Sequence, residues 1–514
     1  MTNDSPSQNR PQSAPSTLAT WVLLAVIFAA VQFASLFTPP LLDDADASHA
    51  QAAQHMALTG DLITLKVNGI RYLEKPPLPY WLDAGLYRIF GENAFAARLP
   101  SLIATAATAV LIYTWGVRLG REWIGFAAAL SYAFCLQTIQ QGRVATADAL
   151  LIFFMMLTAF AGWLIVRPRP GTGAPVACHA VLALGFAGGF LAKGPEAWLP
   201  LLAILWCARG QRLGVVLSFV AGLALILLWG IPAYVETHGD YLWLSWKAGI
   251  ADRMWGADQG HGASSVGMYV LELPYYVIGF WLSALPWSVL ILLNARKLFS
   301  GWKLDLADAY LLLNVIPLWI VFTLGATKLP HYTLPTFPLL ALLFARRWVA
   351  AQLSPSLPIR LAGGFGLAFM ALAIVGIPLA VENGYTPSPV GDLVRDAEFA
   401  LIQIEPVTIP HAGTLPIGMS PFRLTQDAAF ALVDFKEPNV VWEMRRVVNG
   451  YGQAIPEEDV LSYLNQPGPR AVVISTKLWT KLSGEAEPSW RIYSARGFNA
   501  AKGSFIDLTL VVKK

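Results

Sequence analysis

The chain has 514 residues, of which 55% are hydrophobic and only 13% are charged. A soluble protein of this length would carry about 25% charged residues, so the composition excludes an ordinary soluble enzyme and predicts a membrane protein. The net charge of +3 is small and no basic stripe with interleaved aromatic residues occurs, which argues against nucleic-acid binding. Cys135, Cys178 and Cys207 lie in apolar segments and match neither a zinc pattern nor a disulfide framework.

The N-terminal 17 residues are polar and rich in Ser, Pro, Asn and Gln, which predicts a disordered tail. The next run, Leu18 to Phe37, is long enough to cross a bilayer and is not preceded by a strongly basic segment. An uncleaved transmembrane helix is therefore expected here rather than a cleaved signal peptide.

Further apolar runs follow, and together with the first they predict about eleven transmembrane helices. They lie near Leu99 to Val117, Ile124 to Leu136, Ala147 to Val166, Ala177 to Leu191, Ala197 to Cys207, Val215 to Val235, Met268 to Leu293, Ala309 to Leu324, Leu334 to Ala345 and Leu361 to Ala380.

Charge in the connections predicts the orientation of these spans, because cytoplasmic loops hold an excess of Lys and Arg. With the N-terminus inside, five successive alternate loops are basic. Their basic residues are Arg118 and Arg121; Arg167 and Arg169; Arg209 and Arg212; Arg296, Lys297 and Lys303; and Arg346, Arg347 and Arg360. A miscounted span would reverse the assignment downstream, but the agreement of five loops favours one topology. Most Asp, Glu and His residues then fall on the far side of the membrane.

Two far-side segments are too long to be simple connections. Residues 39–98 contain helical patterns, and long structured loops between spans tend to be functional. After about residue 381 charged residues, Pro and Gly return, and short β-type runs alternate with polar helical stretches. The sequence thus predicts a cytoplasmic tail (1–17), a transmembrane domain (18–380) with a large first loop (39–98), and a small soluble α/β domain (381–514).

Carboxylates gather directly after the first span, in the stretch Leu41-Leu-Asp43-Asp44-Ala-Asp46-Ala-Ser-His49. Acidic side chains at the mouth of an apolar bundle are costly unless they are solvated or used. A single Asp here could instead cap a helix N-terminus. Asp46 and His49 are three residues apart and could share one helical face, but two such ligands are a weak metal signal.

A second polar segment runs from Asn68-Gly69 through Tyr72, Glu74 and Lys75 to Pro76-Pro77. Asn-Gly permits a tight turn and the prolines suit the first positions of a helix, so Lys75 is expected near a positive helix N-terminus, which attracts phosphate. The alternative is a lysine that only reaches the lipid headgroups.

Three later motifs place more charge on the same side. Gly142-Arg143-Val-Ala-Thr-Ala-Asp148 leads into an apolar span, where an ionisable residue is a functional candidate, although a purely structural pair of Arg143 and Asp148 is the alternative. Lys193-Gly194-Pro195-Glu196 and Thr327-Lys328-Leu329-Pro330-His331-Tyr332 each join two spans. Each lysine alone would be an interfacial anchor, but together with Lys75 and Arg143 they could form one cluster suited to a phosphate.

In this order the motifs resemble those of integral-membrane glycosyltransferases of the GT-C class, specifically the bacterial aminoarabinose transferase and protein O-mannosyltransferase-like superfamily. The resemblance spans the first apolar run to roughly Trp348. Its most specific part is the first-loop signature Gly60-Asp61, Asn68-Gly69, Tyr72-Leu-Glu-Lys75-Pro-Pro-Leu, Tyr80-Trp81, Phe90-Gly91 and Ala97-Arg98-Leu-Pro100. The family usually has Asp-Glu before the first loop helix, and here the expected Asp falls on Ala45 and the Glu on Asp46. Either Asp44 or Asp46 would therefore be the essential carboxylate.

The resemblance implies a polytopic GT-C enzyme that transfers a sugar from a polyprenyl-phosphate donor to lipid A, another glycolipid or a protein, with inversion, at the periplasmic face of the bacterial inner membrane. It implies no required cofactor, and a divalent metal is only weakly supported. The candidate catalytic residues are Asp44, Asp46 and Asp148; the candidate phosphate-binding residues are Lys75, Tyr72, Arg143, Lys193 and Lys328; further candidates are His49, Glu74, His331 and Tyr332. A hydroxyl acceptor would need a carboxylate to accept its proton, whereas a lipid phosphate is already anionic.

Two other functions share some of these features. A transporter or flippase of a lipid-linked saccharide would also surround a polar cavity with acids and bases. Alternating access, however, needs polar residues through the midplane, and no internal repeat is visible. An assembly partner that binds envelope proteins through the C-terminal domain would leave the membrane carboxylates unexplained.

Overall fold

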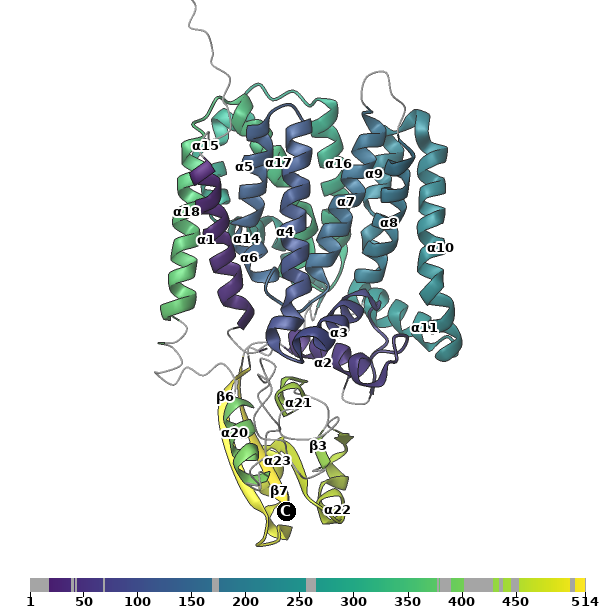
Figure 1. The fold of residues 1–514 in the computed structure, drawn as a ribbon, viewed down its shortest axis with the longest axis vertical. Helices are drawn as coiled ribbons and strands as arrows, with labels where there is room; N and C mark the ends of the chain where they lie inside the picture. Colours follow the sequence, from purple (N-terminus) through teal and green to yellow (C-terminus); the bar gives the residue numbers. More distant parts are fainter. Residues whose placement is uncertain are drawn as a thin grey trace, which may run out of the picture.

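The computed structural model describes residues 18–37, 41, 44–67, 70–168, 175–255, 265–376, 379, 390–401, 429–433, 438–444, 453–499 and 504–513. They form a helical bundle with a smaller α/β unit at one end (Figure 1). The predicted tail (1–17), the Asn68-Gly69 turn and the side chain of Asp44 lie outside the described residues.

The main helices of the bundle run side by side along its axis (Figure 1). They are α1 (Leu18–Phe37), α4 (Ala94–Arg118), α5 (Glu122–Ala133), α7 (Asp148–Val166), α8 (Val176–Ala192), α9 (Pro200–Cys207), α10 (Arg212–Glu236), α14 (Tyr275–Ser283), α15 (Trp287–Phe299), α16 (Leu306–Leu324), α17 (Phe337–Ala350) and α18 (Ser356–Ala371). Shorter helices connect them: α6 (Leu136–Gln141), η1 (Pro195–Trp198), α11 (Asp240–Trp246), η3 (Lys247–Ala251), α12 (Asp252–Trp255), α13 (Val266–Glu272) and η5 (Pro330–Thr336).

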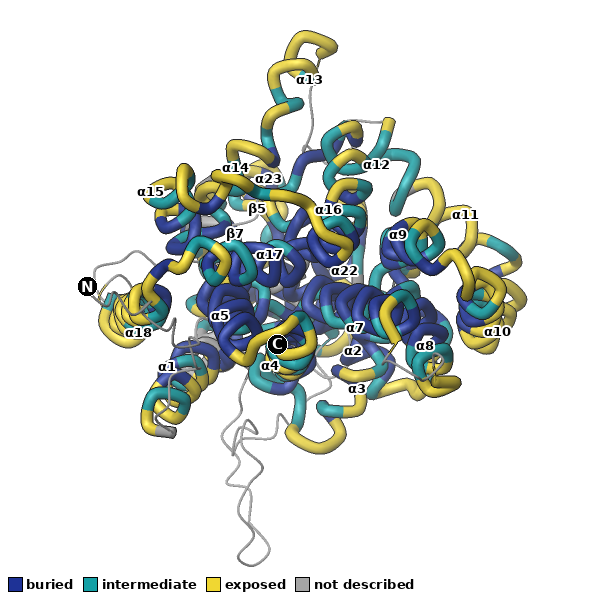
Figure 2. Tube along the Cα trace, turned by 90° about the horizontal axis from the view of Figure 1, so that it is seen from above, coloured by how far each residue is buried: buried dark blue, intermediate teal, exposed yellow. Residues whose placement is uncertain are grey.

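Helix α7 lies inside the bundle, whereas α1, α10 and α18 lie at its edge (Figure 2). In its most apolar stretch α7 is 72% buried, against 28% for α10 and 17% for α18. A helix that is apolar on all sides is stable where other helices or lipid surround it. Helix α7 is therefore enclosed by protein, whereas α10 and α18 expose apolar surface that suits contact with lipid.

Five helices in the described residues are long and apolar enough to cross a membrane, and the bent pair α13–α14 would make six. The five are Ala94–Arg118, Asp148–Val166, Arg209–Glu236, Leu306–Leu324 and Ser356–Gly376. The helices Ala19–Phe33, Val176–Ala192 and Pro195–Cys207 are also apolar but shorter. Most of the other predicted spans are helices too short to meet this criterion. The expectation of about eleven spans therefore remains a prediction.

Two helices of the first loop cover one end of the bundle. They are α2 (Asp44–Thr59) and α3 (Leu78–Phe90), joined through a two-stranded hairpin of β1 (Lys66–Val67) and β2 (Ile70–Arg71). Helix α3 starts directly after Pro77, with a further proline in its first turn, as the sequence predicts.

The described C-terminal residues, 390–513, form an α/β unit below α2 and α3 (Figure 1). Its sheet has the strand order β4-β3-β5-β7-β6, with β3 parallel to β4 and β5, and β7 antiparallel to β5 and β6. The strands are β3 (Ala429–Val433), β4 (Gln453–Ile455), β5 (Arg470–Ser475), β6 (Arg491–Asn499) and β7 (Ser504–Lys513).

Alternating side chains place helices on both faces of this sheet. On β5, Ala471 and Val473 pack with α20 (Val390–Leu401) and α21 (Pro438–Met444). The intervening Val472 and Ile474 pack with α22 (Val460–Asn465) and α23 (Thr476–Leu482). Both faces of β5 are thus apolar and covered.

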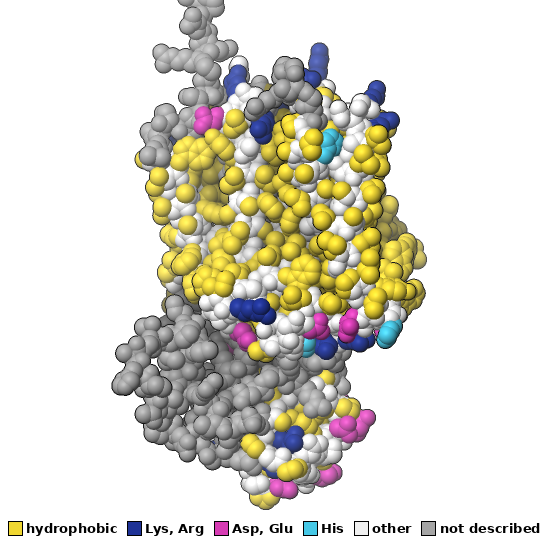
Figure 3. Space-filling view, turned by 45° about the vertical axis from the view of Figure 1, so that its right-hand side comes forward, with side chains coloured by type: hydrophobic (Ala, Val, Ile, Leu, Met, Phe, Trp, Pro, Cys, Tyr) yellow, Lys and Arg dark blue, Asp and Glu magenta, His cyan; other side chains and the backbone are white. Residues whose placement is uncertain are grey.

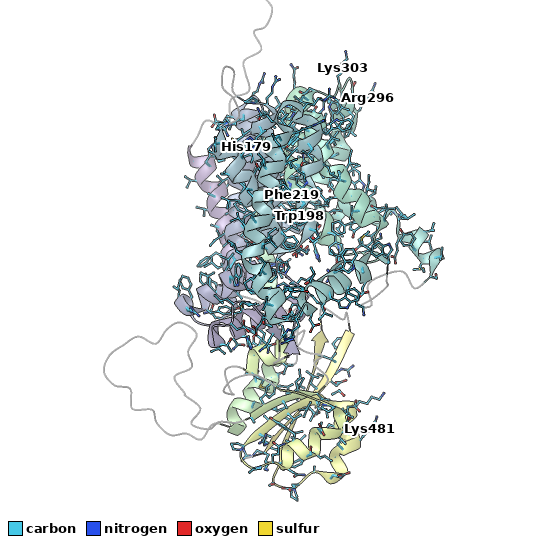
Figure 4. All side chains as sticks on the ribbon, turned by 90° about the vertical axis from the view of Figure 1, so that its right-hand side faces the viewer. His179, Trp198, Phe219, Arg296, Lys303 and Lys481 are labelled. Atoms are coloured by element: carbon cyan, nitrogen blue, oxygen red, sulfur yellow. The ribbon has the colours of Figure 1, made fainter. Side chains whose placement is uncertain are left out.

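The two ends of the molecule differ in charge. Hydrophobic side chains cover the side of the bundle, and Lys and Arg side chains mark its end away from the C-terminal unit (Figure 3). Arg296 and Lys303 lie at that end, opposite Lys481 of the C-terminal unit (Figure 4).

Between the two ends of the molecule, Trp198 packs edge to face on Phe219 of α10 with ring centroids 5.2 Å apart.

Close approach of α4 and α5 depends on two glycines. A Cβ atom on Gly116 would lie 2.3 Å from the Cα of Gly125. Small residues are the usual means by which membrane helices bring their backbones together.

We expect Gly116→Ala to separate α4 from α5 and to destabilise the fold by about 1–3 kcal/mol, the usual cost of overpacking. Thermal unfolding of purified protein would show a lower Tm. Gly230→Ala is the matched control, because a Cβ at Gly230 in α10 meets nothing within 4 Å. Equal Tm values for the two variants would contradict this packing.

Candidate active site

A cavity of about 720 Å³ lies at the end of the bundle near α2 and α3. Its charged lining comes from three separate segments of the chain. They supply Glu74 and Lys75, Lys193 and Glu196, and Arg253, and the lining also includes Tyr332. The remaining wall is mostly apolar and comes largely from α10 and the segment after it, including Ile226, Trp229, Ile231 and Trp246.

Lys75 lies just before the two prolines that start α3, and only 9% of the residue is exposed. The hydroxyl of Tyr241 donates a hydrogen bond to the Lys75 carbonyl, and Ser245 Oγ donates to the Leu73 carbonyl at 2.7 Å. Helix α11 therefore fixes the backbone of this segment. Burial, with the nearby charges of Arg253 and Lys193, lowers the pKa of Lys75 to about 7.

The ammonium of Lys75 has no ion-pair partner among the described residues. Glu74 and Glu196 also line the cavity, but neither carboxylate forms a salt bridge with Lys75. Burying a cation without a counter-ion is unfavourable. An anionic ligand in the cavity would supply the missing counter-ion.

Asp148 is the first residue of α7 and is buried, with its Oδ1 2.5 Å from Lys193 Nζ. His331 Nε2 lies 4.0 Å from the same oxygen. Lys193 also lies over the ring of Tyr332, 5.4 Å from its centroid. The described ion-pair partners of Asp148 are thus Lys193 and, when protonated, His331, rather than Arg143.

Arg253 of α12 is a cavity residue that the sequence motifs do not identify. Its Nη1 donates to the hydroxyl of Tyr332 at 3.1 Å, while its Nε is buried without a hydrogen-bond partner in the described part of the chain. In the sequence, only its place beside Met254 and Trp255 in a far-side segment hints at it.

Asp46 lies in the first turn of α2 and is 3% exposed. It accepts a hydrogen bond from the backbone N–H of Ala145 at 2.5 Å and forms an ion pair with Arg98 at 3.3 Å. Arg143 interacts electrostatically with both members of this pair, and its guanidinium lies 5.3 Å from the Phe369 ring centroid. Arg143 does not line the cavity.

His49 lies one turn further along α2 and stacks on Tyr80 of α3, with centroids 5.1 Å apart. Burial, together with the charge of Lys75, lowers the pKa of His49 to about 3, so its ring is neutral. Its Nδ1 and the Tyr80 hydroxyl are buried without hydrogen-bond partners within the described residues. The pair therefore offers neutral polar groups beside the charged ones.

Lys328 and Tyr72, also candidates from the sequence, lie next to the cavity but do not line it. The ammonium of Lys328 donates to the carbonyls of Phe322, Thr323 and Gly325, at the end of α16. It thus stabilises the C-terminus of that helix. No group of three or more His, Cys, Asp or Glu side chains suited to a metal ion occurs in the described parts of the chain.

The chain is similar in sequence to known membrane transferases. A family model described as dolichyl-phosphate-mannose-protein mannosyltransferase matches residues 74–235. The chain is 31% identical over 365 residues to the undecaprenyl phosphate-alpha-4-amino-4-deoxy-L-arabinose arabinosyl transferase of Pseudomonas aeruginosa (strain UCBPP-PA14), covering 69% of this chain and 64% of that one. It is 28% identical over 337 residues to the transferase of the same name from Aeromonas hydrophila, covering 64% and 60%. The chain thus matches less than two thirds of the length of these relatives.

The fold is similar to that of ArnT from Cupriavidus metallidurans bound to undecaprenyl phosphate. The TM-score is 0.71 at 15% sequence identity, over 96% of this chain and 98% of that one. The apo structure of the same protein gives a TM-score of 0.69. The chain therefore has the GT-C membrane fold and belongs to the aminoarabinose transferase and protein O-mannosyltransferase-like superfamily, as its motifs predict.

Proposed function

We propose that this protein is a glycosyltransferase that moves a sugar from a polyprenyl-phosphate donor to an envelope acceptor. The observation that carries the proposal is the cavity in which the buried ammonium of Lys75 lies with Lys193, Arg253 and Tyr332. The names of the relatives support the donor class. Lipid A is the first acceptor to test.

The lining of the cavity matches both parts of such a donor. A phosphate head would accept hydrogen bonds from Lys75, Lys193 and Arg253, and the Tyr332 hydroxyl would contribute a further contact. The apolar residues of α10 and the following segment, including Ile226 and Trp229, would contact the polyprenyl chain. A charged head beside an apolar wall is the arrangement that an amphipathic phospholipid requires.

The transfer would be a single displacement at the anomeric carbon. An acceptor oxygen forms a bond to that carbon while the bond to the donor phosphate breaks, so the configuration inverts and polyprenyl phosphate leaves. The leaving phosphate gains negative charge, and one well-aimed donor stabilises such charge by about 3 kcal/mol. Lys193, held by Asp148, is positioned for this role.

The carboxylates would act on the acceptor. For a hydroxyl acceptor, Asp46 or Asp44 would accept the proton; for a lipid phosphate, which is already anionic, they would only position the group. Asp46 is held by Ala145 and Arg98, which favours a positioning role for this residue. The Asp44 side chain is outside the described residues and remains the second candidate.

The proposed location of the site is the periplasmic face of the inner membrane. The basic loop residues Arg296 and Lys303 lie at the opposite end of the bundle, and basic loops are typical of the cytoplasmic side (Figure 4). The cavity, the C-terminal unit and α2 would then all face the periplasm.

We expect Lys75→Met and Arg253→Met to lower sugar transfer by about a hundred-fold or more, because each removes a donor to the leaving phosphate. The measurement follows label from a panel of polyprenyl-phosphate sugars to lipid A, glycolipid and protein acceptors. Lys303→Met and Arg296→Met are matched controls at the other end of the bundle and should retain activity. Donor that crosses the bilayer without being consumed, in wild type and variants alike, would instead support a flippase.

We expect the Lys75 contribution to donor affinity to be lost as the pH rises. A lysine with a lowered pKa is charged below that pKa, so its attraction for phosphate is present below about pH 7 and falls above it. Lys75→Arg keeps its charge throughout. The ratio of wild-type to Lys75→Arg affinity for polyprenyl phosphate, measured from about pH 6 to about pH 9, should fall by up to about ten-fold. The ionisation of the phosphate affects both proteins equally and therefore cancels in this ratio. A ratio that stays constant with pH would contradict the lowered pKa of Lys75.

A further inference from the structure

Helix α21 of the C-terminal unit has two buried faces. Val440 and Met444, four residues apart, pack into the core of that unit with α20 and the sheet. Trp442, between them, belongs to a different cluster, formed with α2 and α3. Residues two apart point to opposite sides of a helix, so α21 links the two parts of the protein.

Helix α21 packs on α2, and the cluster that contains Trp442 includes small residues of α2. Ala47, Ala50 and Ala53 are fully buried in the same cluster as Trp442, which is itself 0% exposed. Short side chains let a large indole approach the helix closely. The ring of Tyr87 on α3 lies 5.8 Å from that of Trp442, and its hydroxyl donates to the Ala50 carbonyl at 3.3 Å.

This cluster also includes the residue that binds Asp46. Ala145 packs in it, and its N–H donates to Asp46 in the first turn of α2. His49 follows on the same helix and stacks on Tyr80 of α3, which belongs to the cluster as well. Trp442 therefore packs in the cluster that sets the position of α2 relative to Ala145 and α3.

We propose that Trp442 is a positioning residue, through which the C-terminal unit holds α2 in place so that Asp46 stays against Ala145 and His49 against Tyr80. The inference rests on the proposed transferase function for its kinetic consequence, but the contact itself can be tested without activity. The C-terminal unit thereby acts on the site through α2, although none of its described residues lines the cavity.

The test compares Trp442→Ala, Trp442→Phe and Trp479→Ala in the full-length protein. Trp479 is a buried tryptophan of the same unit, but it packs on the other face of the sheet, away from α2. We expect Trp442→Ala to lower kcat by at least about ten-fold, because small displacements of reacting groups are costly, while KM for the donor changes little. Trp442→Phe should restore most of the rate, and Trp479→Ala should leave kcat near wild type.

Hydrogen–deuterium exchange of α2 is the readout that does not depend on activity. Trp442→Ala should speed exchange in residues 46–58, and Trp479→Ala should not. Unchanged exchange in α2 for Trp442→Ala, or equal losses of kcat for Trp442→Ala and Trp479→Ala, would overturn the proposal. If the wild type transfers no sugar, the proposed function fails, and the exchange of α2 still decides whether Trp442 holds that helix.

Discussion

The buried ion pair of Asp148 and Lys193 is the interaction on which the site depends. Asp148 begins a helix that is enclosed by protein, so its charge has to be matched within the molecule. Lys193, from the end of α8, provides that match at 2.5 Å. Removing one partner of such a pair typically costs about 3–5 kcal/mol, because the other charge stays buried and unpaired. The pair thus joins α7 to the α8–η1 turn and places one cation at the edge of the cavity.

Lys75 and Arg253 differ from Lys193, because neither has a carboxylate partner among the described salt bridges. Both nevertheless line the cavity with Lys193. The protein therefore retains donors that its own side chains do not satisfy, and the neutral form of Lys75 near pH 7 relieves part of the cost. This is the behaviour expected of a site that is completed by its anionic ligand.

Much of this could be predicted from the sequence, and the failures have physical causes. The helices of the first loop follow from their patterns and from Pro76-Pro77, and the candidates Lys75, Lys193 and Tyr332 do meet in one cavity. The partner of Asp148 could not be identified, because Lys193 is brought to it by packing of α8 on α7. A Cβ on Gly185 would lie 2.3 Å from Thr158 Oγ1, which shows how closely these helices approach.

Residues without a motif were missed altogether. Arg253 lies in the short helix α12 with no recognisable motif around it, and only the fold brings it to Tyr332. Trp442 lies far from the motifs in sequence, and its contact with α2 depends on how the C-terminal unit sits against the bundle. Local patterns report the faces of a helix, whereas these contacts depend on tertiary packing.

In the proposed function, one cavity holds the phosphate of a polyprenyl donor. An experimental structure of the protein in a lipid nanodisc with added polyprenyl phosphate tests it most directly. We expect phosphate density within hydrogen-bonding distance of Lys75, Lys193 and Arg253, with the polyprenyl chain along α10. Phosphate density elsewhere, with these three side chains unchanged and without ligand, would contradict it.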